Sequence, residues 1–156
     1  DISGLIGQYA HGNEPSHHVI HLYNYVNRPW RTQELVDSVY RSQYANSVDG
    51  LSGNEDCGQM SSWYVLNSMG FYQVCPGKPV YSIGRPAFDK AVINLPEDKT
   101  FSIIVKNNSK ENKYIESISL NGKSLDTPFF NHQDIANGGT MEISMTDKPN
   151  NKTHIP

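Results

Sequence analysis

Two short polar segments carry residue types that perform chemistry. The first runs from His11 to His18 and contains three histidines, one carboxylate and one carboxamide, in the order H-G-N-E-P-S-H-H. The second runs from Gly53 to Gln59 and places two adjacent carboxylates between glycines, in the order G-N-E-D-C-G-Q. Side chains of these types can bind a metal ion, hold the hydroxyl groups of a sugar or transfer a proton.

The first segment offers ligands for a metal ion or a sugar. Zinc sites often use histidines four residues apart on a helix, whereas His17 and His18 are adjacent and would point in different directions, so zinc is the less favoured ion. The oxygens of Asn13 and Glu14 suit calcium, which takes about six to eight such ligands, more than this segment supplies alone. The structural alternative is that Asn13 and Ser16 cap a helix while the histidines are solvated.

The second segment lies directly before a predicted helix at 60–69. A helix N-terminus stabilises a nearby carboxylate by about 0.3 to 1 kcal/mol, so Glu55 and Asp56 could simply cap that helix. The flanking Gly53 and Gly58 favour a functional interpretation, because glycines give the loop conformational freedom. A carboxylate at this position is predicted to stay ionised at neutral pH, which suits a general base or a metal ligand better than a general acid.

The elements that must position these segments change type near Gly70. Before it, the spacing of apolar residues predicts three helices, at 16–26, from Pro29 towards Tyr44, and at 60–69. After it, alternating apolar residues and turn-forming Pro, Gly and Asn predict strands at 80–83, 90–95, 100–106, 114–120 and 141–145. Asn121-Gly122 suits a tight hairpin turn. We therefore predict an α+β fold, with a helical segment at 1–72 and an antiparallel β-sandwich at 73–156.

The composition excludes several classes of protein. Hydrophobic residues make up 37% and charged residues 19% of the 156 residues, a balance typical of a folded chain. A formal net charge of −3 without a basic run argues against a nucleic-acid partner, and no apolar run approaches the roughly 20 residues of a membrane span. Cys57 and Cys75 lie in unrelated contexts, which predicts free buried thiols, with a single disulfide as the alternative.

The predicted helices present more apolar surface than one small sheet can cover. We therefore expect this surface to pack against further chain, with this sequence as the C-terminal fragment of a longer protein, or to support a dimer through the uncovered helix faces.

Both polar segments and their surroundings resemble glycoside hydrolase family 92, the calcium-dependent exo-acting α-mannosidases. The resemblance is specific over residues 7 to about 95 and vaguer beyond. Three runs carry it: H-G-N-E-P-S-H-H, Y-N-Y-V-N-R-P-W-R-T-Q from Tyr23, and G-N-E-D-C-G-Q-M-S-S-W-Y-V-L-N-S-M-G-F-Y-Q-V-C-P-G from Gly53. It implies a large secreted or periplasmic enzyme with an N-terminal β-sandwich and an (α/α)₆ barrel, whose last helices and C-terminal sandwich are present here.

The resemblance also implies a mechanism. The family inverts the configuration at the anomeric carbon, with a calcium ion contacting the 2- and 3-hydroxyls of mannose. Carried onto this sequence, Asp56 becomes the general base, with Glu55 assisting it, and Asn13 and Glu14 become calcium ligands.

The same resemblance gives the histidines His11, His17 and His18 contacts with the sugar. It places the general acid upstream of Asp1, so the isolated chain is expected to be inactive on the mannose-containing glycans that the parent enzyme hydrolyses.

Two other functions compete with this interpretation. One is a non-catalytic carbohydrate-binding module that uses aromatic residues of the β-half, such as Tyr114, Phe129 and Phe130. Aromatic residues in short strands more often belong to a core, so this alternative is less favoured. The other is a histidine-rich zinc protein.

Overall fold

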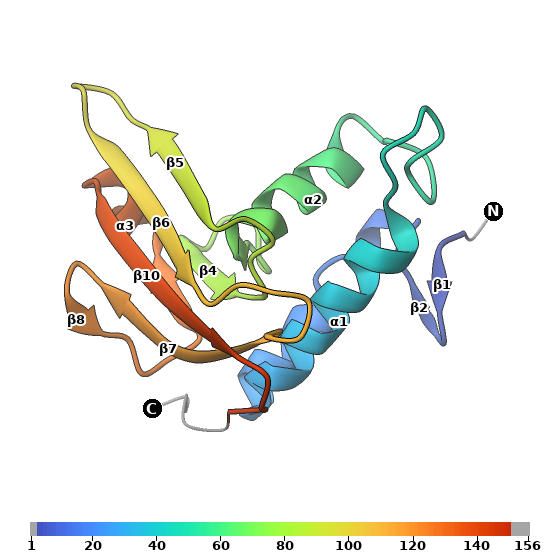
Figure 1. The fold of residues 1–156 in the computed structure, drawn as a ribbon. Coiled ribbons are helices and arrows are strands. Elements are labelled where there is room, and N and C mark those ends of the chain that lie inside the picture. Colours follow the sequence, from blue (N-terminus) through green and yellow to red (C-terminus); the bar gives the residue numbers. More distant parts are fainter. Residues whose placement is uncertain (1–2, 151–156) are drawn as a thin grey trace.

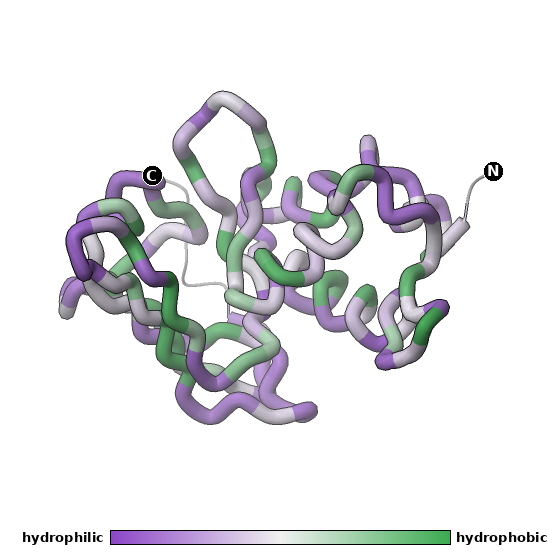
Figure 2. Tube along the Cα trace, turned by 90° about the horizontal axis from the view of Figure 1, so that it is seen from above, coloured by the Kyte–Doolittle hydropathy of each residue, from purple (hydrophilic) through white to green (hydrophobic). Residues whose placement is uncertain are grey.

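The computed structural model describes residues 3–150. The elements of its N-terminal part are β1 (Leu5–Ile6), β2 (Tyr9–Ala10), the 3₁₀ helices η1 (Glu14–Ser16) and η2 (Val19–Val26), α1 (Pro29–Gln43) and α2 (Gln59–Met69). The elements that follow are β3 (Phe71–Tyr72), β4 (Val80–Ile83), β5 (Lys90–Asn94), β6 (Thr100–Lys106), β7 (Tyr114–Leu120), β8 (Lys123–Ser124), β9 (Phe129–Asn131), α3 (His132–Ala136) and β10 (Gly139–Thr146). The helical part and the larger sheet lie on opposite sides of the molecule (Figures 1 and 2).

Two of the three predicted helices form as expected. Helix α1 begins at Pro29, whose fixed φ suits a first turn. Helix α2 ends at Gly70, which adopts a left-handed φ of 103° and donates its N–H to the Asn67 carbonyl at 2.8 Å. The helix predicted at 16–26 is instead split into η1 and η2, which ends at Asn27 with a φ of 57°. None of the helices in residues 3–150 is both long and apolar enough to cross a membrane.

The strands form a five-stranded sheet and a three-stranded sheet. The larger has the order β5-β6-β10-β7-β8 and the smaller β3-β4-β9. All five predicted strands are present, but the expectation of a purely antiparallel arrangement is wrong, because β10 pairs in parallel with β6 and antiparallel with β7. Alternation indicates which residues face inward and says nothing about strand direction. The long connection from β6 allows β10 to enter in the same direction as β6.

A two-residue hairpin connects β7 to β8 as predicted. Leu120 pairs with Lys123, and the intervening Asn121 and Gly122 have φ values of 51° and 77°. Two consecutive positive φ values are those of a type I′ turn, whose twist matches that of the flanking strands.

One hydrophobic core joins the two sheets. Phe101, Ile103 and Val105 of β6 point inward, and Phe71, Ile83 and Phe130 of the smaller sheet belong to the same buried cluster. Leu66 and Met69 of α2 pack against this cluster, so the helical part and the strands are in direct contact. The barrel and sandwich architectures stay predictions, whereas the mixed α/β character of the chain is confirmed.

A buried polar joint also connects the two parts. His21 of η2 is fully buried; its Nε2–H donates to Asn67 Oδ1 at 2.9 Å, and its Nδ1 lies 3.2 Å from the Ser82 hydroxyl. Asn24 donates to that same hydroxyl at 2.7 Å. The Ser82 proton is therefore left for Nδ1, so His21 is a neutral imidazole with its proton on Nε2.

The candidate aromatic residues of the β-half and the two cysteines also had predicted environments. Tyr114 and Phe130 are buried, and the half-buried Phe129 packs on Tyr25 with a ring-centre distance of 4.7 Å, which agrees with a role in the core. Cys57 and Cys75 are free, so no disulfide joins them, but both are exposed. The prediction of buried thiols is wrong because both residues lie in loops, outside the elements that pack the core.

Candidate active site

The fold brings the two polar segments together. The Glu14 carboxyl group, on η1, shares a hydrogen bond with the Asp56 carboxyl group, on the turn before α2. Asp56 is exposed, so it is open to water and to a ligand. The hydrogen bond and the charge of Glu14 raise the pKa of Asp56, whereas a backbone hydrogen bond and then Asp56 lower the pKa of Glu14. When the pair holds one proton, Asp56 therefore carries it.

The raised pKa of Asp56 differs in direction from the sequence-based expectation for a carboxylate at a helix N-terminus. The N-cap of α2 is Gly58, which caps without a side chain, so Asp56 lies beyond the first turn of the helix. A neighbouring carboxylate raises the pKa of an acid, and here this contact outweighs the helix dipole.

The backbone around Asp56 adopts an uncommon conformation. Three consecutive residues, Asp56, Cys57 and Gly58, have positive φ values of 44°, 54° and 85°. Two backbone hydrogen bonds close the turn, from Gln59 N to Asp56 O at 3.1 Å and from Met60 N to Glu55 O at 3.2 Å. Non-glycine residues rarely adopt positive φ, and such conformations cluster at functional sites.

Glu55 has a structural partner. Its Oε1 accepts the backbone N–H of Ser61 at 2.9 Å and its Oε2 accepts the Ser61 hydroxyl at 2.7 Å. These two bonds, the backbone one first, lower the pKa of Glu55. Glu55 thus satisfies a free N–H in the first turn of α2 and fixes the turn next to Asp56. Its assisting role in catalysis stays a prediction.

The interior position of His11 corrects the expectation that it contacts a sugar. His11 is 0% exposed and its ring lies between two tyrosines. Tyr44 OH donates to Met60 O at 3.0 Å, so it accepts the His11 Nε2–H at 2.7 Å, and Tyr9 OH donates to Nδ1 at 2.8 Å. Burial, followed by the proximity of His17, lowers the pKa of His11 to about 3. His11 is a neutral core residue.

His17 is also a core residue, contrary to the same expectation. It is 1% exposed, its Nε2 donates to the His11 carbonyl at 2.8 Å, and its Nδ1 accepts the Gln59 amide at 3.1 Å. Its ring stacks on that of His11 with centres 4.8 Å apart. Of the three histidines of this segment, only His18 retains accessible surface, and its contact with a sugar stays a prediction.

The oxygen atoms beside Asp56 fit a hard cation such as calcium. Glu14 Oε1 is shielded from solvent, and no hydroxyl or amide of residues 3–150 donates to it. Asn13, the preceding residue in the sequence, is exposed. Within the described residues no three His, Cys, Asp or Glu side chains are close enough to hold a metal by themselves, so further oxygens must complete any calcium shell. A histidine zinc centre does not fit, because both ring nitrogens of His11 and His17 already have partners.

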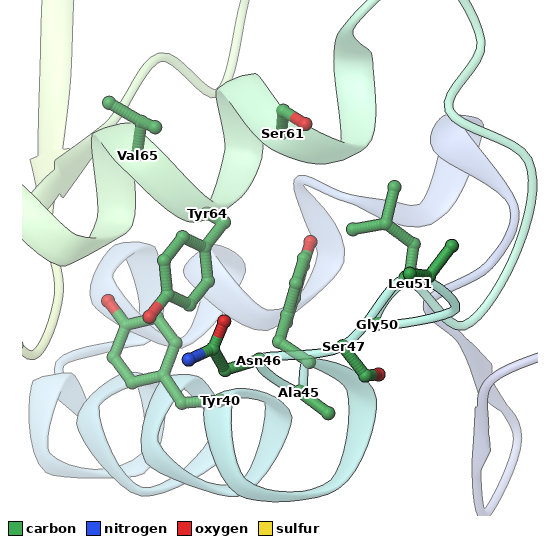
Figure 3. Close-up of a pocket in the computed structure, with 11 residues that line it drawn as sticks. Tyr40, Ala45, Asn46, Ser47, Gly50, Leu51, Ser61, Tyr64 and Val65 are labelled. Atoms are coloured by element: carbon green, nitrogen blue, oxygen red, sulfur yellow. The ribbon is translucent and has the colours of Figure 1, made fainter.

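A separate pocket lies between α1, α2 and the loop that joins them (Figure 3). Its volume is about 490 Å³, and its walls include Tyr40, Tyr64 and Val65. Neither Glu14 nor Asp56 lines it, although Ser61, which bonds Glu55, does.

Sequence reasoning missed Tyr9 and Tyr44, which carry no local signal, and Gln59, which lies within the second polar segment.

Comparisons with known proteins identify the family of this chain. The family model described as "Glycosyl hydrolase family 92 catalytic domain" matches residues 1–147. An uncharacterized secreted glycosidase from Arthroderma benhamiae is 36% identical over 137 residues, which are 86% of this chain and 18% of that protein. The chain therefore spans about a fifth of this curated relative.

Solved structures give the same result at the level of the fold. A family GH92 α-mannosidase from Bacteroides thetaiotaomicron, solved in complex with mannoimidazole, superposes with a TM-score of 0.93 at 41% identity. The matched region is 98% of this chain and 20% of the mannosidase chain. A family GH92 inverting mannosidase from the same organism superposes with a TM-score of 0.88 at 42% identity. The matched region is 95% of this chain and 20% of that mannosidase chain. The family-model match, the sequence identities and the shared fold place the chain in glycosyl hydrolase family 92.

Proposed function

We propose that this chain is the C-terminal part of a longer, calcium-dependent, inverting exo-α-mannosidase that hydrolyses α-mannosides of N-glycans or mannans. The observation that carries the proposal is the carboxyl pair of Glu14 and Asp56, which combines an exposed acid with an oxygen that is shielded from solvent. The solved relatives are a family GH92 α-mannosidase and an inverting mannosidase, which supports the substrate class and the stereochemistry.

Asp56 is the proposed general base. In its ionised form its carboxylate accepts a proton from the attacking water, and the turn fixed by Glu55 holds it in place. An inverting enzyme needs a second, protonated carboxyl group about 6.5 to 9.5 Å away, across the sugar. Glu14 is hydrogen-bonded to Asp56 and therefore too close for that role, so we infer that the acid comes from outside these 156 residues and that the chain alone is inactive.

Glu14 and Asn13 are the proposed calcium ligands. Glu14 supplies an oxygen without a hydrogen-bond donor, and Asn13 adds a carboxamide oxygen from the adjacent residue. When bound, calcium supplies positive charge beside the hydroxyl groups of the sugar. A cation near Glu14 also favours the ionised form of Asp56, which is the form that acts as a base.

The location and the alternative function follow from the same observations. We propose a secreted or periplasmic enzyme, in line with the curated relative that is named a secreted glycosidase. A carbohydrate-binding module is less well supported, because two of its three candidate aromatic residues, Tyr114 and Phe130, are buried.

The test compares the longer enzyme with the isolated chain on an aryl α-mannoside. We expect turnover by the longer enzyme only, loss of turnover on chelation and its recovery with calcium, and β-mannose as the first product in proton NMR spectra. Asp56→Asn should abolish turnover without unfolding the protein, whereas Asn54→Asp, two residues away on the exposed loop, serves as a charge control. Turnover by the isolated chain, or full activity of Asp56→Asn, would contradict the proposal.

A further inference from the structure

The carboxyl pair of Glu14 and Asp56 needs a device that fixes its separation. Both side chains are charged in their ionised forms and therefore repel each other, and they lie on separate segments, Glu14 on the short 3₁₀ helix η1 and Asp56 in the turn before α2. Carboxyl groups that hold a cation or activate water must be placed to within about 0.5 Å, which loops achieve only with support from neighbouring residues.

Backbone hydrogen bonds attach each acid to one neighbour. The carbonyl of Glu14 accepts the N–H of His17 at 3.0 Å. The carbonyl of Asp56 accepts the N–H of Gln59 at 3.1 Å. In both cases the neighbour is three residues further along the chain, at the end of the same turn.

A side-chain hydrogen bond then joins the two neighbours. Gln59 Nε2 donates to His17 Nδ1 at 3.1 Å, across 42 residues of sequence. The four contacts form a closed circuit that runs from Glu14 through His17 and Gln59 to Asp56 and back across the carboxyl pair. The bond between His17 and Gln59 is thus a side-chain contact that joins the turn of Glu14 to the turn of Asp56.

Only one assignment of donor and acceptor is consistent with the hydrogen bond between Gln59 and His17. The Nε2 of His17 donates to the carbonyl of His11, so Nδ1 carries a lone pair and requires a donor. Gln59 Nε2 has two protons, and its second partner is Tyr72 OH at 3.1 Å. Glutamate or methionine at position 59 has no amide proton to donate, and asparagine is one methylene group shorter.

His17 is itself held from several sides. It is buried, its ring stacks on His11, and its carbonyl accepts the indole N–H of Trp63 at 3.2 Å. It thus provides an anchor in the core for a bond that reaches the exposed side of the site, next to the loop with positive φ values at Asp56 and Cys57.

We propose that Gln59 is a positioning residue, which acts through its hydrogen bond to buried His17 to set the separation of Glu14 and Asp56 and thereby the calcium affinity of the site. This inference rests on the proposed function above. In this proposal both residues act through the two acids.

The test uses Gln59→Met in the longer enzyme, with Gln133→Met as a matched control. Gln133 lies on α3, is exposed and donates its side-chain amide to Asn137 Oδ1 at 2.7 Å, so its replacement changes the same residue type on a different element. Loss of a residue that orients a metal ligand typically costs about 10- to 100-fold in metal affinity. We expect the calcium concentration for half-maximal activity to rise by this factor for Gln59→Met and to stay unchanged for Gln133→Met.

A second readout does not depend on turnover. Terbium ions replace calcium at oxygen-rich sites and are sensitised by nearby aromatic residues, so a terbium titration should show the same shift in the half-saturating concentration. Gln59→Asn keeps the polarity of position 59 and is the variant to use if Gln59→Met does not fold; it should give the same shift. Tyr72→Phe keeps the bond to His17 and should shift the value by less than about threefold.

The outcomes separate the inference from the proposed function. If the wild-type enzyme binds neither calcium nor terbium, the proposed function and the inference both fail. If the wild-type enzyme binds them and the Gln59 variants have the same half-saturating concentrations, only the positioning role fails. A purely structural role would lower the melting temperature and the active fraction without moving the calcium dependence, and that result also overturns the inference.

Discussion

His21 makes the stability of the chain depend on pH. Burial lowers the pKa of this residue from 6.5 to about 4, although the hydrogen bond to Asn67 acts in the opposite direction. The native state therefore binds the proton less well than the unfolded state does. A histidine with a lowered native pKa stabilises the fold fully above pH 6.5, and this contribution is lost as the pH falls towards 4.

The size of this effect follows from the two pKa values. A difference of 2.5 units, 6.5 minus 4, corresponds to about 3 kcal/mol at pH values below both. Between pH 7 and pH 5 the same values give a loss of about 2 kcal/mol, because the unfolded residue is then almost fully protonated and the native residue mostly neutral. That loss is large for a domain whose total stability is about 5 to 15 kcal/mol.

Urea unfolding of wild type and His21→Gln at the two pH values measures this contribution. Fluorescence of the buried Trp63 follows the transition. His11 and His17 titrate in both proteins, so their effects cancel when the pH-dependent losses are subtracted. We expect wild type to lose about 2 kcal/mol more than His21→Gln between pH 7 and pH 5. Equal losses in the two proteins would refute the assignment of a buried neutral His21.

Two further predictions concern the elements around the site. Glu55→Ala should reduce the free energy of unfolding by about 1 kcal/mol, because it leaves the Ser61 N–H without its partner. Urea unfolding at pH 7 tests this. Glu116→Ala, at an exposed position, is the control. Arg85→Met should lower the free energy of unfolding more than Arg41→Met does, because buried Arg85 also donates to the carbonyls of Pro86 and Ser109, whereas Arg41 is an exposed partner of Asp37 worth less than about 1 kcal/mol. Similar values for the two variants would contradict this prediction.

Local patterns were sufficient to predict most of the regular elements. Apolar spacing and the stop at Gly70 located α1 and α2, and alternation located all five longer strands. The short elements were missed, since β3, β8 and β9 have only two or three residues and show no period. The direction of β10 was also missed, because it depends on the path of a distant connection.

The site was predictable only in part for a similar reason. The acids were recognisable because Asp56 and Glu14 lie in segments dense in polar residues. The burial of His11 depends on Tyr44, which is 33 residues away in sequence and approaches only in the folded chain. A histidine next to polar neighbours has the same local pattern whether it faces a sugar or two tyrosines.

The position of β10 determines when the larger sheet can assemble. This strand lies between β6 and β7, although it is synthesised after both of them (Figure 1). During translation β6 and β7 cannot pair with each other as they do with β10. The centre of the sheet is therefore incomplete until residues 139–146 leave the ribosome. Until then the edges of β6 and β7 that β10 will cover have unpaired backbone N–H and C=O groups, and such edges are open to pairing with other chains.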